Sequence, residues 1–190
     1  MVSLTETQEA ILDAVQSVIV REGVSGASMR QVAETADVSL GLLSYHFDDK
    51  DSLIAAAFKR ATQAVFDASV AAAATVEDPV KRVSSFLRGS FTGDFLDGDY
   101  LRLRIALWTV AVTDPALAKI DAQFYEKYRK ALVALLADAS PELDQAELRD
   151  RVTDVISFSN GLWLHWARFG ELDDLERGLQ RCEEIALGNG

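Results

Sequence analysis

Hydrophobic residues recur along most of the chain at the spacing of an amphipathic helix. In residues 5–22 they lie three or four positions apart, which places them on one helical face. Those positions are Ile11, Ala14, Val15, Val18 and Ile19. The three prolines follow Asp78, Asp114 and Ser140, whose side chains can cap a helix, and proline is tolerated in a first helical turn. Because no run alternates in the manner of a strand, we predict an all-α fold of about nine helices.

The spacing of these segments predicts short helices first and longer helices afterwards. A short helix begins at Ser28 and another covers residues 40–46, with a tight break between them. The later predicted helices cover residues 50–76, 79–95, 100–112, 115–137, 145–169 and 172–187. This change of pattern predicts an N-terminal domain over residues 1–49, a connecting helix over residues 50–76 and a C-terminal domain over residues 77–190.

The second and third helices have the proportions of a helix-turn-helix, in which the second helix of the pair enters the major groove of DNA. The apolar residues that can pack against the first helix are Val32, Ala33, Val38, Leu43 and Phe47. The residues left facing outwards are Ser39, Leu40, Gly41, Ser44 and Tyr45. Gly41 would let the backbone approach a base or a phosphate, because it has no side chain. Short helix pairs also occur in many proteins that bind no DNA, so this geometry alone does not decide the function.

The residues around this helix pair resemble the DNA-binding signature of the TetR family of bacterial repressors. The matching positions are Ser28 to Ser39, Gly41, Leu43, His46, Phe47, Lys50 and Leu53. Residues 41–47 are most similar to the subgroup that contains the choline-responsive repressor of glycine-betaine synthesis, and residues 160–164 resemble its eighth helix. The resemblance implies a transcriptional repressor that binds a pseudopalindromic operator as a homodimer through its third helix. It also implies release from DNA by a small-molecule effector.

The resemblance assigns roles to individual residues. The expected base contacts are Ser39, Leu40 and Tyr45, and the expected phosphate contacts are Ser28, Ser44, His46 and Lys50. At Gly41 we expect the helix backbone itself to approach the DNA closely. Two positions depart from the family, because many members have glycine where this chain has Asp37 and tyrosine where it has Ser44. Aspartate tolerates the positive φ of a tight turn better than most residues, so we expect the turn to form. Serine at position 44 removes one aromatic phosphate contact.

The charge of the chain argues against a nucleic acid partner. The 190 residues include 19 basic and 30 acidic ones, for a net charge of −11, and residues 1–50 hold three basic and eight acidic residues. Residues 40–47 carry no acid, so we expect binding with few phosphates neutralised and a modest salt dependence. The competing interpretation is a helical binding or scaffold protein whose DNA-binding face has decayed. Asp37, Ser44 and the acidic N-terminal domain favour that alternative.

Aromatic residues are frequent in the predicted C-terminal helices. Such residues usually form a core, but as a set they are compatible with a ligand cavity, because ligand sites in helical bundles are mostly apolar. The candidate ligand-binding residues are Phe91, Phe95, Trp108, Phe124, Tyr128, Phe158, Asn160, Trp163 and Trp166. Tryptophan faces can hold a cation, so a quaternary amine is one candidate effector, in line with the subgroup resemblance.

The resemblance further implies that the last two predicted helices form a four-helix dimer interface with those of a second chain. The candidate interface residues are Val152, Ile156, Trp163, Leu175, Leu179 and Cys182. The alternative is that these apolar side chains pack within their own chain.

The sequence lacks the motifs of common enzyme sites. It has no glycine-rich phosphate loop and no cysteine pair, and its two histidines, His46 and His165, are a weak basis for a metal site. We therefore expect no enzyme, no cofactor and no metal. Residues 155–167 form the longest membrane-like segment but are too short and too polar for the roughly 20 residues of a span. No secretory signal is visible, so we expect a cytoplasmic protein with no membrane partner.

Overall fold

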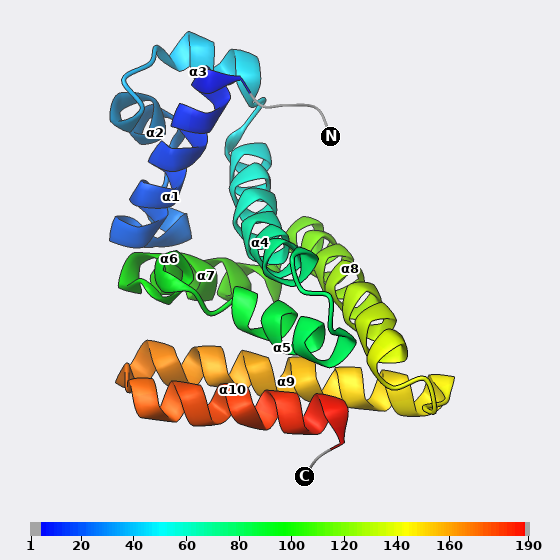
Figure 1. Cartoon of the computed structure of the whole chain (residues 1–190). Helices are drawn as coiled ribbons and strands as arrows, with labels where there is room; N and C mark the ends of the chain where they lie inside the picture. Colours follow the sequence, from blue (N-terminus) through cyan, green and yellow to red (C-terminus); the bar gives the residue numbers. More distant parts are fainter. Residues whose placement is uncertain (1–4, 189–190) are drawn as a thin grey trace. The chain divides into compact units, whose positions relative to one another are not determined.

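The computed structural model describes residues 5–188 and contains ten helices and no strand within that range (Figure 1). The helices are α1 (Glu6–Gly26), α2 (Met29–Thr35), α3 (Leu40–His46), α4 (Lys50–Ala74), α5 (Pro79–Gly89), α6 (Gly93–Leu96), α7 (Gly98–Ala111), α8 (Pro115–Ala139), α9 (Gln145–Phe169) and α10 (Leu172–Leu187). The predicted all-α fold is confirmed. Over the described residues, no helix combines the length and the apolar character needed to span a membrane.

Two of the three prolines begin helices as predicted. Asp78 caps α5 by accepting a backbone hydrogen bond (2.9 Å), and Asp114 accepts two at the start of α8 (2.8 and 3.0 Å). The prediction for the third is wrong, because Ser140 lies at the end of α8, where its N–H donates to the carbonyl of Leu136 (2.8 Å). Asp144 begins α9 instead, accepting two backbone hydrogen bonds of 2.7 and 2.9 Å.

The predicted helix over residues 79–95 is split in the structure. α5 ends at Gly89, and the short helix α6 begins at Gly93. The hydroxyl of Ser90 donates to the carbonyl of Leu87 (3.1 Å), and Thr92 has an extended backbone with φ −102° and ψ 167°. Glycine weakens a helix, and two glycines flank this break. Residues 5–188 therefore form ten helices rather than the nine predicted.

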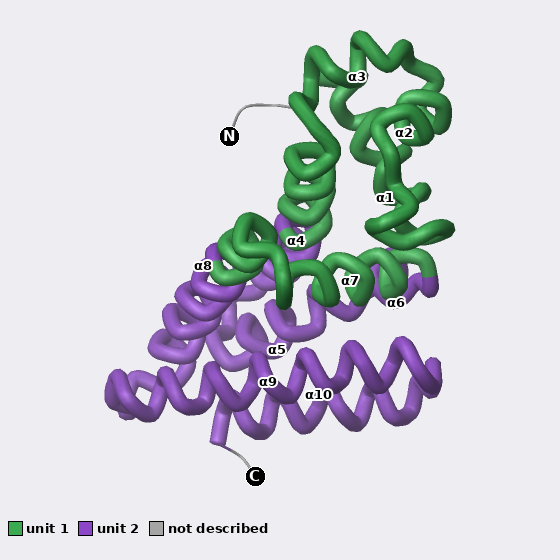
Figure 2. Tube along the Cα trace, turned by 180° about the vertical axis from the view of Figure 1, so that it is seen from behind, with its two compact units in different colours: residues 1–62, 99–122 green, residues 63–98, 123–190 purple. Residues whose placement is uncertain are grey.

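The contacts divide the chain into two compact units, which Figure 2 shows in different colours. Unit 1 comprises residues 1–62 and 99–122. Its hydrophobic core joins α1, α2, α3 and the start of α4 to residues of α7 and α8. The core residues on α7 and α8 are Leu103, Leu107, Ala111 and Leu117. The functional boundaries at residues 49 and 76 are distinct from this division and stay a prediction.

Arg60 on α4 holds α1 against α4 within unit 1. Its guanidinium donates to the carboxylates of Glu9 (3.0 Å) and Asp13 (2.6 Å) and to the side-chain oxygen of Gln16 (2.6 Å). The Arg60 side chain is only 21% exposed, so these bonds form in a partly dry environment. α1 is therefore fixed to the helix that follows the helix-turn-helix.

Unit 2 comprises residues 63–98 and 123–190. In it α9 and α10 lie side by side and antiparallel (Figures 1 and 2), and Gly170 ends α9 in the left-handed conformation with φ 65°. Arg88 on α5 forms ion pairs with Glu176 (2.7 Å) and Glu183 (2.6 Å) on α10. The hydrogen bond from Arg88 holds the pKa of Glu176 below its usual range. α5 is thus attached to α10 by charged groups.

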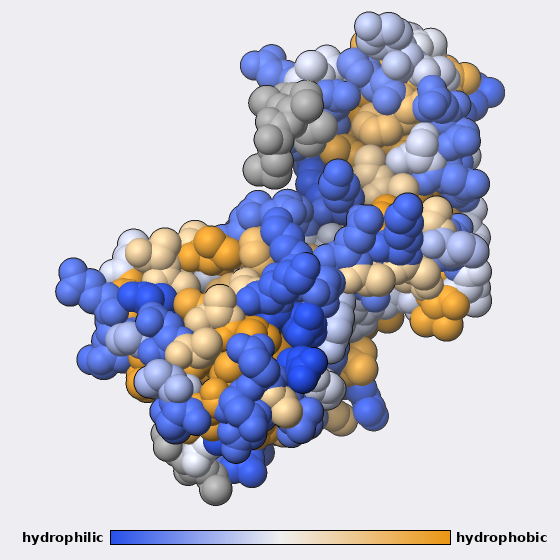
Figure 3. Space-filling model, turned by 90° about the vertical axis from the view of Figure 1, so that its right-hand side faces the viewer, coloured by the Kyte–Doolittle hydropathy of each residue, from blue (hydrophilic) through white to orange (hydrophobic). Residues whose placement is uncertain are grey.

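The surface mixes hydrophobic and hydrophilic side chains. On the face drawn in Figure 3, hydrophobic patches are visible among hydrophilic residues. The large hydrophobic residues most exposed in the described chain include Tyr45 on α3, Leu172 on α10 and Val112 after α7. A single exposed apolar residue is ordinary in proteins, so a functional surface has to be argued from its neighbours.

Candidate nucleic-acid interface

The two short helices are each started by a serine. The hydroxyl of Ser28 accepts a hydrogen bond from the backbone N–H of Gln31 (3.3 Å), and that of Ser39 accepts one from Leu42 (3.1 Å). Both residues were predicted to contact DNA. A hydroxyl that accepts one bond still has its own hydrogen to donate, so capping and a DNA contact are compatible.

The turn between α2 and α3 forms around Asp37. This residue has φ 53° and is the only non-glycine residue in the left-handed region among those described. The backbone N–H of Val38 then donates to the carbonyl of Ala33 (3.0 Å), which closes the turn. The expectation that aspartate supports the turn in place of glycine is confirmed.

α3 has a buried face and an outer face. Leu43 is fully buried and Phe47 is 8% exposed, which anchors the helix in the core of unit 1. On the other side Tyr45 is 81% exposed, and Leu40 and Leu42 are 48% and 40% exposed. Ser44 and Gly41 are exposed as well, and His46 is half-buried with its ring edge-on to Tyr45 at 5.2 Å. The predicted outer residues therefore do lie on the surface.

Gly41 is a glycine that the fold does not require. Its φ lies outside the left-handed region, and a Cβ added there would meet only the hydroxyl of Ser39, at 4.0 Å. Glycine costs a helix stability compared with alanine. Gly41 therefore leaves the backbone of α3 open to a close approach by a second molecule.

The three basic residues in the first 50 positions all have partners in the chain. The ammonium group of Lys50 donates to the carbonyl of Ser25 (3.0 Å), and Arg30 pairs with Glu34 one turn further on (3.1 Å). Arg21 donates to the hydroxyl of Ser17 (3.3 Å). Exposed bonds of this kind are weak and exchange readily for a phosphate. The cations are therefore available, but they are few.

The predicted ligand-binding residues do not form one cluster within a single unit. Trp108 belongs to unit 1, where the guanidinium of Arg104 lies 4.5 Å from its ring centre. In unit 2, Phe91 stacks on Trp163 at 4.7 Å. The rings of Phe124 and Tyr128, also in unit 2, lie 6.2 Å apart, and the indole N–H of Trp166 donates to the carbonyl of Leu96 (3.0 Å). The remaining candidates of unit 2 are half-buried Phe95 and exposed Phe158 and Asn160.

The predicted dimer residues are all buried within the chain. Their exposed fractions lie between 0% and 7%, and they are Val152, Ile156, Trp163, Leu175, Leu179 and Cys182. The thiol of Cys182 lies 3.4 Å from the hydroxyl of Ser159, and burial raises its pKa. These residues therefore fasten α9 and α10 to their own unit. Their predicted part in a dimer interface stays a prediction.

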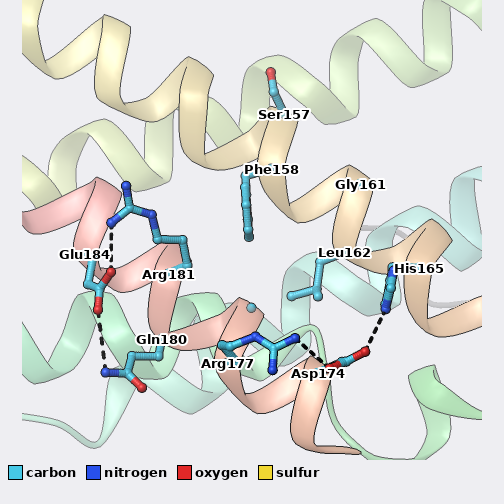
Figure 4. Close-up of a pocket in the computed structure, with 11 residues that line it drawn as sticks. Ser157, Phe158, Gly161, Leu162, His165, Asp174, Arg177, Gln180, Arg181 and Glu184 are labelled. Carbon is cyan, nitrogen blue, oxygen red and sulfur yellow. Dashed lines mark hydrogen bonds and ion pairs between the residues drawn. The ribbon is translucent and has the colours of Figure 1, made fainter. Parts of the chain in front are cut away.

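The outer side of α9 and α10 carries a groove of about 800 Å³ (Figure 4). Phe158 and Leu162 lie along it, and Gly178 brings α10 so close to α9 that an added Cβ would collide with Leu162. At one end Asp174 binds His165 (3.2 Å) and Arg177 (2.6 Å). The bonds from His165 and Arg177 lower the pKa of Asp174.

Phe158 is the one residue of the candidate ligand-binding set that lines this groove. The available signal was Gly178, because glycine inside an apolar helical pattern often marks close packing. Its contact with Leu162, however, depends on the antiparallel pairing of α9 with α10, which the spacing of apolar residues alone does not reveal.

The arrangement of α1 to α4, with an exposed outer face on α3, is that of a helix-turn-helix, a motif common in transcriptional regulators. Residues 79–186 match the family of BetI-type transcriptional repressor C-terminal domains, and residues 11–57 match the bacterial regulatory proteins of the tetR family. The chain belongs to the TetR family of regulators and carries a BetI-type C-terminal domain. Both families are regulators, which confirms the expectation that the protein is not an enzyme.

Individual relatives agree with this assignment. The HTH-type transcriptional regulator BetI of Paraburkholderia phytofirmans is 27% identical over 171 residues, which cover 90% of this chain and 86% of that protein. A solved structure described as a transcriptional regulator from Pseudomonas aeruginosa PAO1 superposes with a TM-score of 0.86 at 27% identity, covering 96% of this chain and 89% of the other. A regulator from Saccharomonospora viridis, solved in complex with choline, shares the fold with a TM-score of 0.79 at 18% identity, covering 96% of each chain.

Proposed function

We propose that the protein is a ligand-responsive repressor that binds a pseudopalindromic operator as a homodimer and is released from it by a small-molecule effector. The observation that carries this proposal is the outer face of α3. It combines exposed Leu40 and Tyr45 with Gly41, a glycine that the fold itself does not require. A decayed DNA-binding face would have no reason to keep that glycine, which disfavours the scaffold alternative.

In this proposal α3 lies in the major groove. The base contacts come from Ser39, Leu40 and Tyr45. Phosphate contacts come from Ser28, Ser44, His46 and Lys50, of which Lys50 exchanges its bond to a backbone carbonyl for a phosphate oxygen. In a homodimer the two α3 helices would read half-sites about 34–36 Å apart, one turn of the DNA helix.

We propose that the second chain binds to the groove on α9 and α10. The groove exposes apolar Phe158 between charged pairs such as Arg181 with Glu184 (2.8 Å), and it extends along both helices. Replacing Phe158 with glutamate would place a charge in the proposed contact. Sedimentation should then show a monomer, whereas the control Val80→Ala, at an exposed position of α5, should remain a dimer. A dimeric Phe158→Glu protein would contradict this placement.

We propose a quaternary amine as the effector class, supported by the aromatic residues of unit 2 and the BetI-type C-terminal domain. Choline is the first compound to test. A ligand shifts a conformational equilibrium only by its difference in affinity for the two states. Choline should therefore weaken operator binding, and an operator affinity that is unchanged at saturating choline would exclude it as the effector.

The central test is selection of duplexes from a random library by the purified protein. We expect recovery of a short palindrome. The double variant Tyr45→Ala with Lys50→Ala should lose affinity for it, whereas the control Tyr125→Ala with Lys119→Ala, two exposed residues of α8, should retain it. Failure to bind any duplex would favour the scaffold alternative.

A further inference from the structure

The recognition helix has an unusual composition. α3 reads Leu-Gly-Leu-Leu-Ser-Tyr-His and contains no arginine, lysine, asparagine, glutamine, aspartate or glutamate. Paired hydrogen bonds to guanine need arginine or lysine, those to adenine need asparagine or glutamine, and acceptors for cytosine are aspartate and glutamate. α3 therefore has none of the side chains that read bases by paired hydrogen bonds.

What α3 does present is a largely apolar surface. Leu40, Leu42 and Tyr45 are its exposed large side chains, and Gly41 lies among them on the helix. The major groove displays one apolar group, the C5-methyl of thymine, which marks thymine against the other bases. An apolar surface fits that methyl group, and Gly41, which has no side chain, leaves room for it among the larger residues.

The neighbouring cations do not supply the missing hydrogen bonds. Arg30 lies on α2 and pairs with Glu34, and Lys50 lies at the start of α4 and binds the carbonyl of Ser25. In the proposed function Lys50 contacts the DNA backbone, which positions the protein without reading its sequence. Base readout is therefore left to α3.

We propose that α3 recognises its half-site chiefly through thymine C5-methyl groups, which pack against Leu40 and Tyr45 on either side of Gly41. This inference rests on the proposed function, since it presupposes that α3 enters the major groove. It specifies the chemistry that the operator must offer: T·A pairs at the positions under α3.

The test uses the duplex recovered by selection from the random library. Thymines are replaced by deoxyuridine one position at a time, symmetrically in both half-sites, which removes only the C5-methyl group. At the positions under α3 we expect the affinity to fall about tenfold for the two methyls lost. Exchanging such a T·A pair for 5-methylcytosine·G should retain more affinity than exchanging it for unmethylated C·G.

Protein variants identify the contacting side chain. Leu40→Ala should weaken binding to the thymine duplex by about tenfold and to the deoxyuridine duplex much less. The reason is that the protein substitution and the loss of the methyl group from the DNA remove the same contact. Val80→Ala on α5 is the control, since Val80 is 45% exposed and Leu40 is 48% exposed. Tyr45→Phe keeps the ring that packs against the methyl group, so its preference for the thymine duplex over the deoxyuridine duplex should match that of the unchanged protein. Circular dichroism checks that each variant is folded.

The outcomes separate this inference from the proposed function. A selected duplex that binds tightly, yet tolerates deoxyuridine at every position, overturns the methyl readout and leaves the repressor proposal intact. A strong loss of duplex affinity in Tyr45→Phe would assign the base readout to the phenol hydroxyl and would also overturn the methyl readout. If no duplex binds, the proposed function fails first, and the methyl readout fails with it.

Discussion

The glycine on the recognition helix should be dispensable for folding and essential for DNA binding. In Gly41→Ala the new Cβ would lie 4.0 Å from the hydroxyl of Ser39, which is ordinary van der Waals contact, and the backbone conformation suits alanine. Because alanine restricts the unfolded chain more than glycine does, the free energy of unfolding should rise by about 0.4–1 kcal/mol. That corresponds to an increase in Tm of roughly 1–4 °C for a chain of this size.

The same methyl group should interfere with DNA. It would stand between α3 and the base-pair edges, and forcing a methyl into a packed contact typically costs about 1–3 kcal/mol. Operator affinity should therefore fall by about tenfold or more. The assay pairs a thermal unfolding curve with a binding titration of fluorescent operator duplex, both measured on the same preparation.

Gly89 provides the matched control, because it is a helical glycine that the fold does require. A Cβ at this position would lie 2.7 Å from the Cα of Ser69 and 2.9 Å from the carbonyl oxygen of Ala68, both backbone atoms that cannot move aside. Gly89→Ala should therefore lower the Tm. If Gly41→Ala also lowered the Tm, or left operator affinity unchanged, the functional explanation of Gly41 would be refuted.

Three further predictions concern the turn, the ion pair and the electrostatics. Asp37→Val should lower the free energy of unfolding in urea by about 1–2 kcal/mol, since valine tolerates φ 53° poorly, whereas Asp37→Gly should be nearly neutral. Arg88 lowers the pKa of Glu176, so that pair stabilises the fold above the ordinary glutamate pKa of 4.5, and its contribution is lost as the pH falls through the lower folded pKa. The Tm of Glu176→Gln should accordingly fall less on acidification than that of the unchanged protein. With about three cations per subunit, the slope of log K against log salt should be near −5, and a slope steeper than about −8 would contradict this.

The helices could be predicted from the sequence wherever a cap and an apolar face coincide. α9 and α10 cover the predicted residues 145–169 and 172–187, because glycine at position 170 ends the first helix and apolar spacing is regular on both sides. The break between α5 and α6 was missed. It depends on the Ser90 hydroxyl bonding back to α5, and apolar residues continue across it in helical spacing.

The candidate site could likewise be predicted from the sequence only in part. The outer face of α3 follows from one helix and its buried anchor Leu43, so local periodicity is enough to identify it. The residues proposed for the dimer interface show the opposite case. Periodicity indicates that Leu175 and Leu179 share an apolar face, but it does not indicate whether that face is covered by the same chain or by another. Only the packing within unit 2 shows that both are buried.

The acidic charge of the chain and the shape of α3 lead to one conclusion about regulation. Because few cations are available, the electrostatic attraction that holds repressors to any DNA sequence is weak here. In the proposed homodimer, affinity would then come from close contact at both half-sites, at Gly41 and its apolar neighbours. Such contacts would be lost when the spacing of the two α3 helices no longer fits the operator, and little non-specific binding would remain to hold the protein in place. On this reasoning an effector needs only a modest preference for the misfitting state to release the repressor.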